Sequence, residues 1–274
     1  MSSPKSTRRY AAPALTKGLR LLEVLATSPA PMTQSDLARA LHKSPAEIFR
    51  MLNVLSSEGY IHRDTQGSYL PTLKLFALGR AVNPLSTLLV TAVGPMREFA
   101  RLSGQECHLS VLDEGRLVVL AQESGTAAVS IRIIEGSQHN PLTTASGRLL
   151  LALLPGTEAE RQIRLARGLF KASPPRTSVL RRELKRIAAT GYSEARDESR
   201  AGLADTAVAV QGAGPWPHAA LASSHFIAEI RGSRPKEILH HLRTAAESIV
   251  QSHQPCAVSP KQPTHATVKH GPRH

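Results

Sequence analysis

The sequence is poor in cysteine, in aromatic residues and in acidic residues. Its 274 residues include two cysteines, Cys107 and Cys256, which are too few for a disulfide framework and too far apart for a CxxC metal site. The longest apolar stretch, Leu149 to Leu154, is far too short to cross a bilayer. The basic N-terminus lacks the apolar core of a signal peptide. We therefore expect a cytoplasmic protein without a membrane segment.

Positive charge exceeds negative charge, and the excess is unevenly distributed. The formal charge is +13, from 34 Lys and Arg against 21 Asp and Glu. Residues 1–80 contain 11 basic and 5 acidic side chains, residues 81–250 contain 20 and 16, and residues 251–274 contain 3 and 0. A concentrated positive charge indicates a polyanionic partner, here at the N-terminal end.

The C-terminal end has the composition of a disordered segment. From Ser252 onward it has four histidines, four prolines and no acidic residue. Residues 252–274 are therefore predicted to be a disordered tail. Its histidines either remain solvated or bind a metal weakly, and no other metal or cofactor site is predicted.

Three short helices are predicted in the first 60 residues. Leucines at helical spacing over residues 15–25 predict the first helix. Thr33 is a suitable N-cap for a second helix, which ends near His42. The run Ser44-Pro45-Ala46-Glu47 is a strong helix start, and the third helix continues to about Ser57. The short turn between the second and third helices is typical of a helix-turn-helix.

A small hairpin follows these helices. Residues 60–63 and 68–70 alternate between apolar and polar side chains, and Asp64-Thr65-Gln66-Gly67 between them has turn chemistry. Three helices and a hairpin predict a winged helix-turn-helix over residues 13–80, preceded by a basic flexible arm over residues 1–12.

The third helix is the candidate DNA reader. Its exposed face presents Arg50 and Asn53, and these residue types hydrogen-bond guanine and adenine in the major groove. The arm and the hairpin tip can reach phosphates or the minor groove. The predicted DNA-binding residues are Lys5, Arg8, Arg9, Thr33, Gln34, Ser44, Pro45, Ala46, Glu47, Arg50, Asn53, Arg63 and Gln66. In the alternative interpretation this helix face is merely solvated, and Arg63 is paired with Asp64.

The rest of the chain predicts a second, α+β domain. Helical periodicity over residues 85–102 predicts a linker helix within residues 81–103, in which Pro95 causes a kink or a division into two helices. Further helices are predicted at about 145–154, 157–167, 176–190 and 235–250. Strands are predicted at 108–112, 116–121, 128–133, 207–210 and 219–222. The domain, residues 104–251, is expected to contain an antiparallel sheet flanked by helices.

Motifs in both domains resemble the IclR family of bacterial transcription regulators. In the first domain these are residues 16–22, 44–55, Gly59-Tyr60-Ile61 and Tyr69-Leu70. In the second they are residues 104–111, Pro141-Leu142, 144–148, Gly191-Tyr192 and 202–205. Ser44-Pro45-Ala46 departs from the Ser-Thr-Val of many members, and residues 222–226 lack their Ser-Gly-Pro. The resemblance implies a GAF-like effector-binding domain, and a dimer or dimer of dimers on a palindromic DNA operator.

The predicted effector site centres on Thr144-Ala145-Ser146-Gly147. A loop that enters a helix leaves unpaired backbone N–H groups, which suit a carboxylate. The resemblance implies that a small organic acid or aromatic effector lies there, facing Asp205 and Ser224, with Cys107 as a further contact. Since Asp205 repels an acid, the effector is neutral or brings a hydroxyl or amine for Asp205. Alternatively Cys107 is a core residue, Ser146 a helix cap, and Asp205 a buried structural group.

Two other function classes fit the sequence less well. A thiol or serine hydrolase using Cys107 or Ser146 would need a histidine partner, but Cys107 and His108 are adjacent on a strand and point to opposite faces. The sequence also lacks a nucleophile elbow, an HExxH motif and a phosphate loop. An architectural DNA-coating protein would explain the positive charge but not the nearly balanced second domain.

Overall fold

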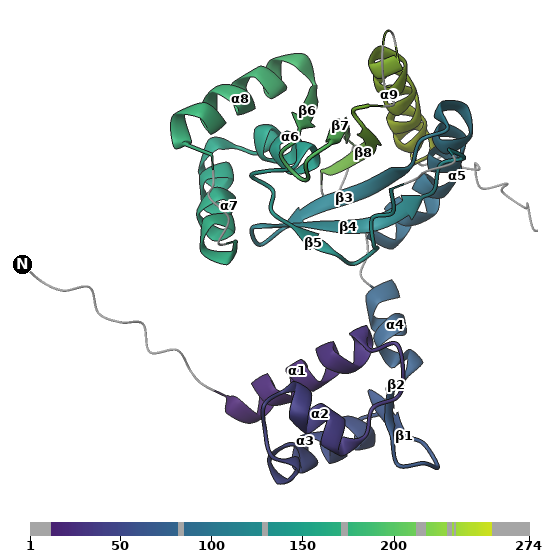
Figure 1. Cartoon of the computed structure of the whole chain (residues 1–274), viewed down its shortest axis with the longest axis vertical. Helices are drawn as coiled ribbons and strands as arrows, with labels where there is room; N and C mark the ends of the chain where they lie inside the picture. Colours follow the sequence, from purple (N-terminus) through teal and green to yellow (C-terminus); the bar gives the residue numbers. More distant parts are fainter. Residues whose placement is uncertain are drawn as a thin grey trace, which may run out of the picture. The chain divides into compact units, whose positions relative to one another are not determined.

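The chain consists of two compact units, which meet between Asn83 and Pro84. The computed structural model describes residues 12–81, 85–127, 131–170, 175–211, 218–228, 232 and 234–253 (Figure 1). Within these residues, no helix is both long enough and apolar enough to span a membrane. The predicted basic arm and C-terminal tail lie outside the described residues, apart from Ala12, Ser252 and His253.

The N-terminal unit has the predicted winged helix-turn-helix fold. Its elements are α1 (Pro13–Thr27), α2 (Gln34–Ala40), α3 (Pro45–Ser57), β1 (Ile61–Arg63), β2 (Tyr69–Pro71) and α4 (Leu73–Arg80). The two strands pair antiparallel as a small wing. One face of each of the first three helices forms the core, where Leu21, Leu37 and Ile48 are fully buried. Of the leucines at helical spacing in α1, Leu21 and Leu25 lie in this core, whereas Leu15 and Leu19 are exposed, so the spacing predicted the helix but only part of its buried face.

The second unit is built on a six-stranded antiparallel sheet. Its strands are β3 (Cys107–Asp113), β4 (Arg116–Glu123), β5 (Gln138–His139), β6 (Tyr192–Arg196), β7 (Leu203–Val210) and β8 (Ala219–Phe226). Their order across the sheet is β5-β4-β3-β8-β7-β6, and all neighbours are antiparallel. The predicted α+β class, with an antiparallel sheet flanked by helices, is confirmed.

Helices cover both faces of this sheet (Figure 1). On one face α5 (Leu85–Ser103) and α9 (Arg234–His253) pack together over the sheet, so the predicted linker helix belongs to the core of this unit. The other face is covered by α6 (Ala145–Leu153), whose apolar side packs against alanines of β7 and β8. The helices α7 (Gly156–Leu169) and α8 (Thr177–Thr190) pack beside α6.

Three details differ from the predictions. The strand predicted at 128–133 does not form over residues 131–133, and residues 128–130 lie outside the described part. The short strands β5 and β6 were not predicted, because two to five mixed residues carry too little alternation to detect. Pro95 does not divide α5, which is one helix from Leu85 to Ser103.

The start of α6 is packed unusually close to the loop before it. A Cβ atom on Gly147 would lie 2.5 Å from the carbonyl oxygen of Pro141, a separation that real Cβ atoms essentially never show. Glycine is therefore required here by the close approach of two backbone segments. This contact places the first turn of α6 against residues 140–144.

Replacing Gly147 with alanine should lower the free energy of unfolding by about 1–3 kcal/mol, the usual cost of overpacking. Urea denaturation measures this change. The control is Gly168→Ala in α7, where nothing lies within 4 Å of the added Cβ. That variant should be stabilised by about 0.5–1 kcal/mol, because alanine favours a helix more than glycine. A Gly147→Ala protein as stable as the wild type would contradict the close packing.

Candidate DNA-binding surface and effector cavity

The exposed face of α3 carries the side chains best suited to read bases. Ile48 and Leu52 point into the core, and Arg50 and Asn53 are exposed on the other side of the helix. Among the described residues, neither Arg50 nor Asn53 has a hydrogen bond or ion pair. Phe49 is also exposed on α3, by 48%, and the sequence analysis did not single it out. The guanidinium and amide groups are therefore available to a ligand.

In the helix-turn-helix, four of the predicted DNA-binding residues already have structural partners. Thr33 and Ser44 are N-caps of α2 and α3, and each forms a capping box with the acid three residues later. In α3 that acid is Glu47, whose pKa is lowered by the Ser44 backbone N–H and by the Lys17 ammonium. Gln34 donates from Nε2 to the Pro45 carbonyl oxygen at 2.9 Å, so it ties the two helices together. These side chains shape the motif that presents Arg50.

The wing has its own internal contacts. Arg63 donates from Nε to the Gly67 carbonyl oxygen at 3.2 Å and lies over the Tyr69 ring. Asp64 accepts from the backbone N–H groups of Gln66 and Ser68, and so it closes the turn. Arg63 and Asp64 therefore have separate partners in the described part of the chain, and the alternative prediction that they pair with each other is wrong. Lys5, Arg8 and Arg9 of the predicted arm lie outside the described residues.

The second unit contains a cavity of about 340 Å³ on the α6 face of the sheet. It is lined from β3, β4, the segment 131–139, the start of α6, residues 199–205 and β8. Its apolar walls include Leu117, Val119, Ile131, Ile133 and Leu203. The volume is within the range of pockets that bury a small organic molecule.

Five of the seven predicted effector residues line this cavity: Thr144, Ala145, Ser146, Asp205 and Ser224. Thr144 caps α6 by accepting from the Gly147 backbone N–H at 3.3 Å. The N–H groups of Ala145 and Ser146, in the same first turn, have no partner within the helix. Gly147 does not line the cavity, because it packs against Pro141.

Cys107 does not line the cavity either, which corrects its assignment as an effector contact. It is fully buried in the core between the sheet and α5, with Sγ 3.5 Å from the Met96 carbonyl oxygen. Burial and the neighbouring Glu106 carboxylate raise the pKa of this thiol. A thiol that is buried and protonated cannot act as a nucleophile, so the hydrolase interpretation loses its cysteine.

Asp205 acts on the cavity through two serine hydroxyls. Ser199 donates to Asp205 Oδ2 at 2.7 Å, and Ser224 donates to Asp205 Oδ1 at 2.6 Å. The serine hydroxyl donates in both hydrogen bonds, so both hydroxyl protons point at Asp205. The lone pairs of the two serine oxygens then remain to accept from a ligand. This arrangement reduces the repulsion of an acidic ligand that the sequence alone predicts.

A buried contact between a histidine and a carboxylate lies beside these serines. Glu106 accepts from the Ser224 backbone N–H at 2.6 Å, and its other oxygen is 3.4 Å from His108 Nδ1. Burial disfavours the charged imidazole, but Glu106 and Asp205 outweigh it and raise the pKa of His108. Burial and the nearby His108 lower the pKa of His139, which lies 2.9 Å from the Ser137 hydroxyl. Each imidazole at the cavity therefore has a partner other than Ser146.

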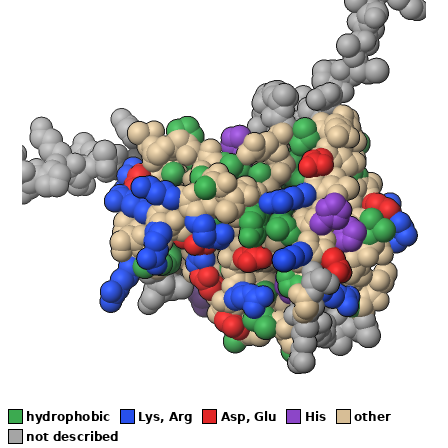
Figure 2. Space-filling view, turned by 90° about the horizontal axis from the view of Figure 1, so that it is seen from above, with side chains coloured by type: hydrophobic (Ala, Val, Ile, Leu, Met, Phe, Trp, Pro, Cys, Tyr) green, Lys and Arg blue, Asp and Glu red, His purple; other side chains and the backbone are tan. Residues whose placement is uncertain are grey.

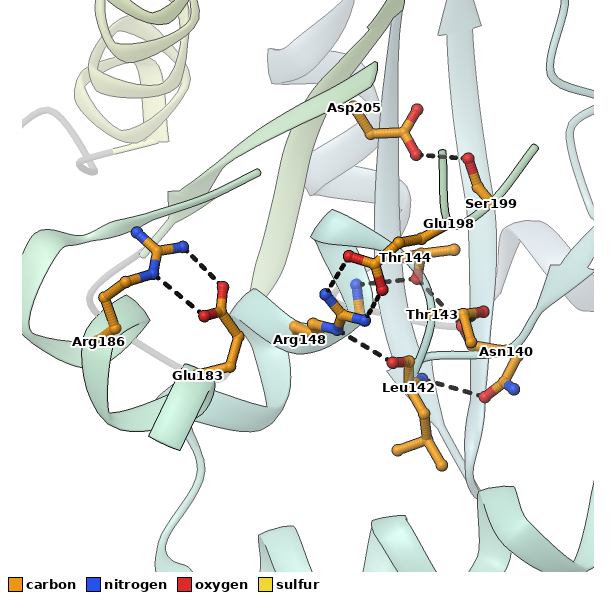
Figure 3. A network of polar contacts seen from close by, with 11 residues as sticks. Asn140, Leu142, Thr143, Thr144, Arg148, Glu183, Arg186, Glu198, Ser199 and Asp205 are labelled. Atoms are coloured by element: carbon orange, nitrogen blue, oxygen red, sulfur yellow. Dashed lines mark hydrogen bonds and ion pairs between the residues drawn. The ribbon is translucent and has the colours of Figure 1, made fainter. Parts of the chain in front are cut away.

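Arg148 fixes the loops that surround the predicted site (Figure 3). It is 6% exposed, it donates from Nε to the Leu142 carbonyl oxygen at 3.0 Å, and its two terminal nitrogens hold both oxygens of Glu198. Ser199 follows Glu198 directly and binds Asp205. The buried guanidinium thus connects the loop before α6 with the segment that carries Ser199 and Arg200 to the cavity.

The sequence analysis missed several cavity residues. His108, His139 and Ser199 are polar examples, and Arg132 and Arg200 are charged ones. The alternation at Cys107 and His108 did indicate that His108 faces away from the cysteine. No local pattern could place residues 199 and 200 near residue 145, because that proximity is made by the sheet. Among the described residues, no group of three or more His, Cys, Asp or Glu could hold a metal ion.

Two family profiles match the chain. The profile described as "Bacterial transcriptional regulator IclR C-terminal" matches residues 86–251, and "IclR helix-turn-helix domain" matches residues 14–65. The HTH-type transcriptional regulator KdgR of Escherichia coli is 28% identical over 221 residues, which cover 78% of this chain and 83% of KdgR. The HTH-type transcriptional regulator Rv1719 of Mycobacterium tuberculosis is 27% identical over 221 residues, covering 76% and 80%.

Solved structures share the fold at lower identity. The Thermotoga maritima IclR matches with a TM-score of 0.66 at 22% identity, over 86% of this chain and 97% of that one. An IclR homolog from Microbacterium hydrocarbonoxydans, complexed with 4-hydroxybenzoate, matches with a TM-score of 0.72 at 22% identity, over 87% and 98%. The C-terminal profile alone matches 166 of the 274 residues, which is more than half of the chain. The chain belongs to the IclR family of bacterial transcriptional regulators.

Proposed function

We propose that this regulator reads a palindromic operator with α3, as a dimer or a dimer of dimers, and that an effector in the cavity changes its DNA binding. Membership of the family makes the chain a DNA-binding transcriptional regulator with an effector-binding domain, and not an enzyme. The reading residues, the operator symmetry and the effector class are the parts proposed here.

Arg50 and Asn53 are the proposed base-reading residues. Both are exposed on α3, and neither has a partner in the described part of the chain. Arginine can donate two hydrogen bonds to guanine, and asparagine can pair in the same way with adenine.

The other proposed contacts surround these two residues. Pro45 and Ala46, exposed in the first turn of α3, would contact the groove wall or a thymine methyl group. Arg63 and Gln66 of the wing, and the arm with Lys5, Arg8 and Arg9, would contact the backbone.

The proposed effector is a carboxylate with a hydroxyl at its other end and an apolar middle. The free N–H groups of Ala145 and Ser146 suit the carboxylate. The oxygens of Ser199 and Ser224, whose protons are held by Asp205, suit a donor such as a hydroxyl. Aliphatic walls lie between them. The pairing of these hydroxyls with Asp205 is the observation that carries the proposal.

The 4-hydroxybenzoate bound in the Microbacterium hydrocarbonoxydans homolog has these three features, so it is a suitable probe here. An effector that touches both the start of α6 and Ser199 would favour one arrangement of the two loops joined by Arg148. It would change DNA binding only by its different affinity for the DNA-bound and free arrangements. A purely architectural DNA-coating protein would have no use for such a cavity.

Arg50→Ala should weaken operator binding by about 1–3 kcal/mol and relax the base preference at one position of each half-site. Selection from a random duplex pool defines the preferred sequence, and gel-shift titration measures the affinity. Arg20→Ala, which removes another exposed cation, from α1, is the control and should leave the preference intact. Unchanged affinity and preference in Arg50→Ala would contradict the reader assignment. Binding without any sequence preference in the wild type would favour the architectural class.

In a thermal-shift titration, 4-hydroxybenzoate should stabilise the protein more than benzoate does, because a bound ligand stabilises by mass action. A single hydrogen bond to Ser224 corresponds to about 1 kcal/mol, or roughly a five-fold difference in Kd. Ser224→Ala should remove that difference. Ser193→Ala should keep that difference, because Ser193 is a buried serine whose hydroxyl has no hydrogen-bond partner among the described residues and does not line the cavity. Equal affinity of the wild type for both acids would contradict the proposed ligand class.

A further inference from the structure

The segment with α7 and α8 holds the positive charge of the second unit. Residues 156–190 contain nine Lys and Arg and three Asp and Glu, whereas the rest of 84–250 contains 11 basic and 13 acidic residues. The near balance of this domain therefore conceals one strongly basic part. Figure 2 shows Lys and Arg side chains gathered at the left, the side on which α7 and α8 lie in Figure 1.

The acidic side chains of these two helices are already neutralised. Each has an arginine partner within 3.0 Å, in the pairs Glu158–Arg161, Glu160–Arg181 and Glu183–Arg186. Four exposed cations have no hydrogen bond or ion pair within the described part of the chain: Arg164, Arg176, Arg182 and Lys185. We call these four residues the α7–α8 basic surface.

Charged and polar side chains link the two helices. Arg181 of α8 is paired with Glu160 of α7 at 2.7 Å, and Arg167 of α7 donates to the Thr177 hydroxyl of α8 at 3.0 Å. Arg181 lowers the pKa of Glu160 most, and Arg164 contributes as well, so cations from both helices surround one carboxylate. Positive charge is thus in excess at the junction itself.

We propose that the α7–α8 basic surface binds the phosphate backbone of DNA, in addition to the contacts of the winged helix. Three of its four cations are arginines, whose planar guanidinium matches the oxygens of a phosphate. The three carboxylates of α7 and α8 are all paired with arginines, so no unpaired carboxylate in the described part of these helices would repel the phosphates. Leu169 and Val179 are the large apolar side chains exposed on these helices, which is too little apolar area for the core of a protein–protein interface. The duplex that the regulator binds is a polyanion of the required chemistry.

The test is the salt dependence of DNA binding by the full-length chain. Fluorescence anisotropy with an arbitrary duplex of about 60 base pairs gives the slope of log K against log salt, which changes by about 0.9 for each phosphate contact. The double variant Arg164→Gln and Arg182→Gln should reduce this slope by about 1–2. Both side chains are exposed, so an unchanged melting temperature should accompany the loss.

The matched control is the double variant Arg234→Gln and Lys236→Gln, which removes the same charge from the exposed start of α9 and should leave the slope unchanged. Equal slopes for the two double variants would overturn the proposal. Binding to polyglutamate can be measured in the same way for the Arg164→Gln and Arg182→Gln variant. If this variant lost binding to polyglutamate while its DNA slope stayed unchanged, the proposal would also be overturned and the surface would be assigned to an acidic protein. Neither result depends on Arg50, because an arbitrary duplex does not test base reading.

Discussion

The buried guanidinium of Arg148 is the interaction on which the geometry of the second domain depends most. Arginine is seldom buried unless all its donors are used, and here they bind the Leu142 carbonyl oxygen and both oxygens of Glu198. One side chain on α6 thus holds the loop before its own helix and the turn after β6. The first of these loops leads into the first turn of α6 and the second carries Ser199, so two polar parts of the cavity wall are fixed together, while Ser224 lies on β8.

At the cavity, the Asp205 carboxylate accepts hydrogen bonds from the hydroxyls of Ser199 and Ser224 and so sets their orientation. Considered alone, Asp205 is unsuited to a site for an acidic ligand, because like charges repel. Its two hydrogen bonds from Ser199 and Ser224 change that, since the surface offered to a ligand consists of serine oxygens with fixed orientation. Glu106 has a similar role one step further away, where its partners are the Ser224 backbone and His108. Asp205 and Glu106 thus hydrogen-bond to neutral serine groups at the cavity.

The net charge of the second domain does not show where its charged side chains lie. The sequence assigned the excess of positive charge to the N-terminal end and treated the second domain as nearly balanced. Placed on the fold, the three acids of α7 and α8 are each paired with an arginine, while four exposed cations of this segment have no hydrogen bond or ion pair among the described residues. Summing charge over residues 81–250 does not detect this surface, because it lies on two helices of 14 residues each.

The sequence by itself determined the winged helix, because its helices and turns depend on neighbouring residues. Apolar spacing, the capping residues Thr33 and Ser44, and the turn at Asp64 are all local signals. It also indicated Thr144, Ser146, Asp205 and Ser224 as cavity residues, through the resemblance to a family. Only the tertiary structure decided that Cys107 faces the core and that Ser199 and Arg200 reach the cavity. The sheet brings together residues separated by more than 50 positions, and no local pattern records such a pairing.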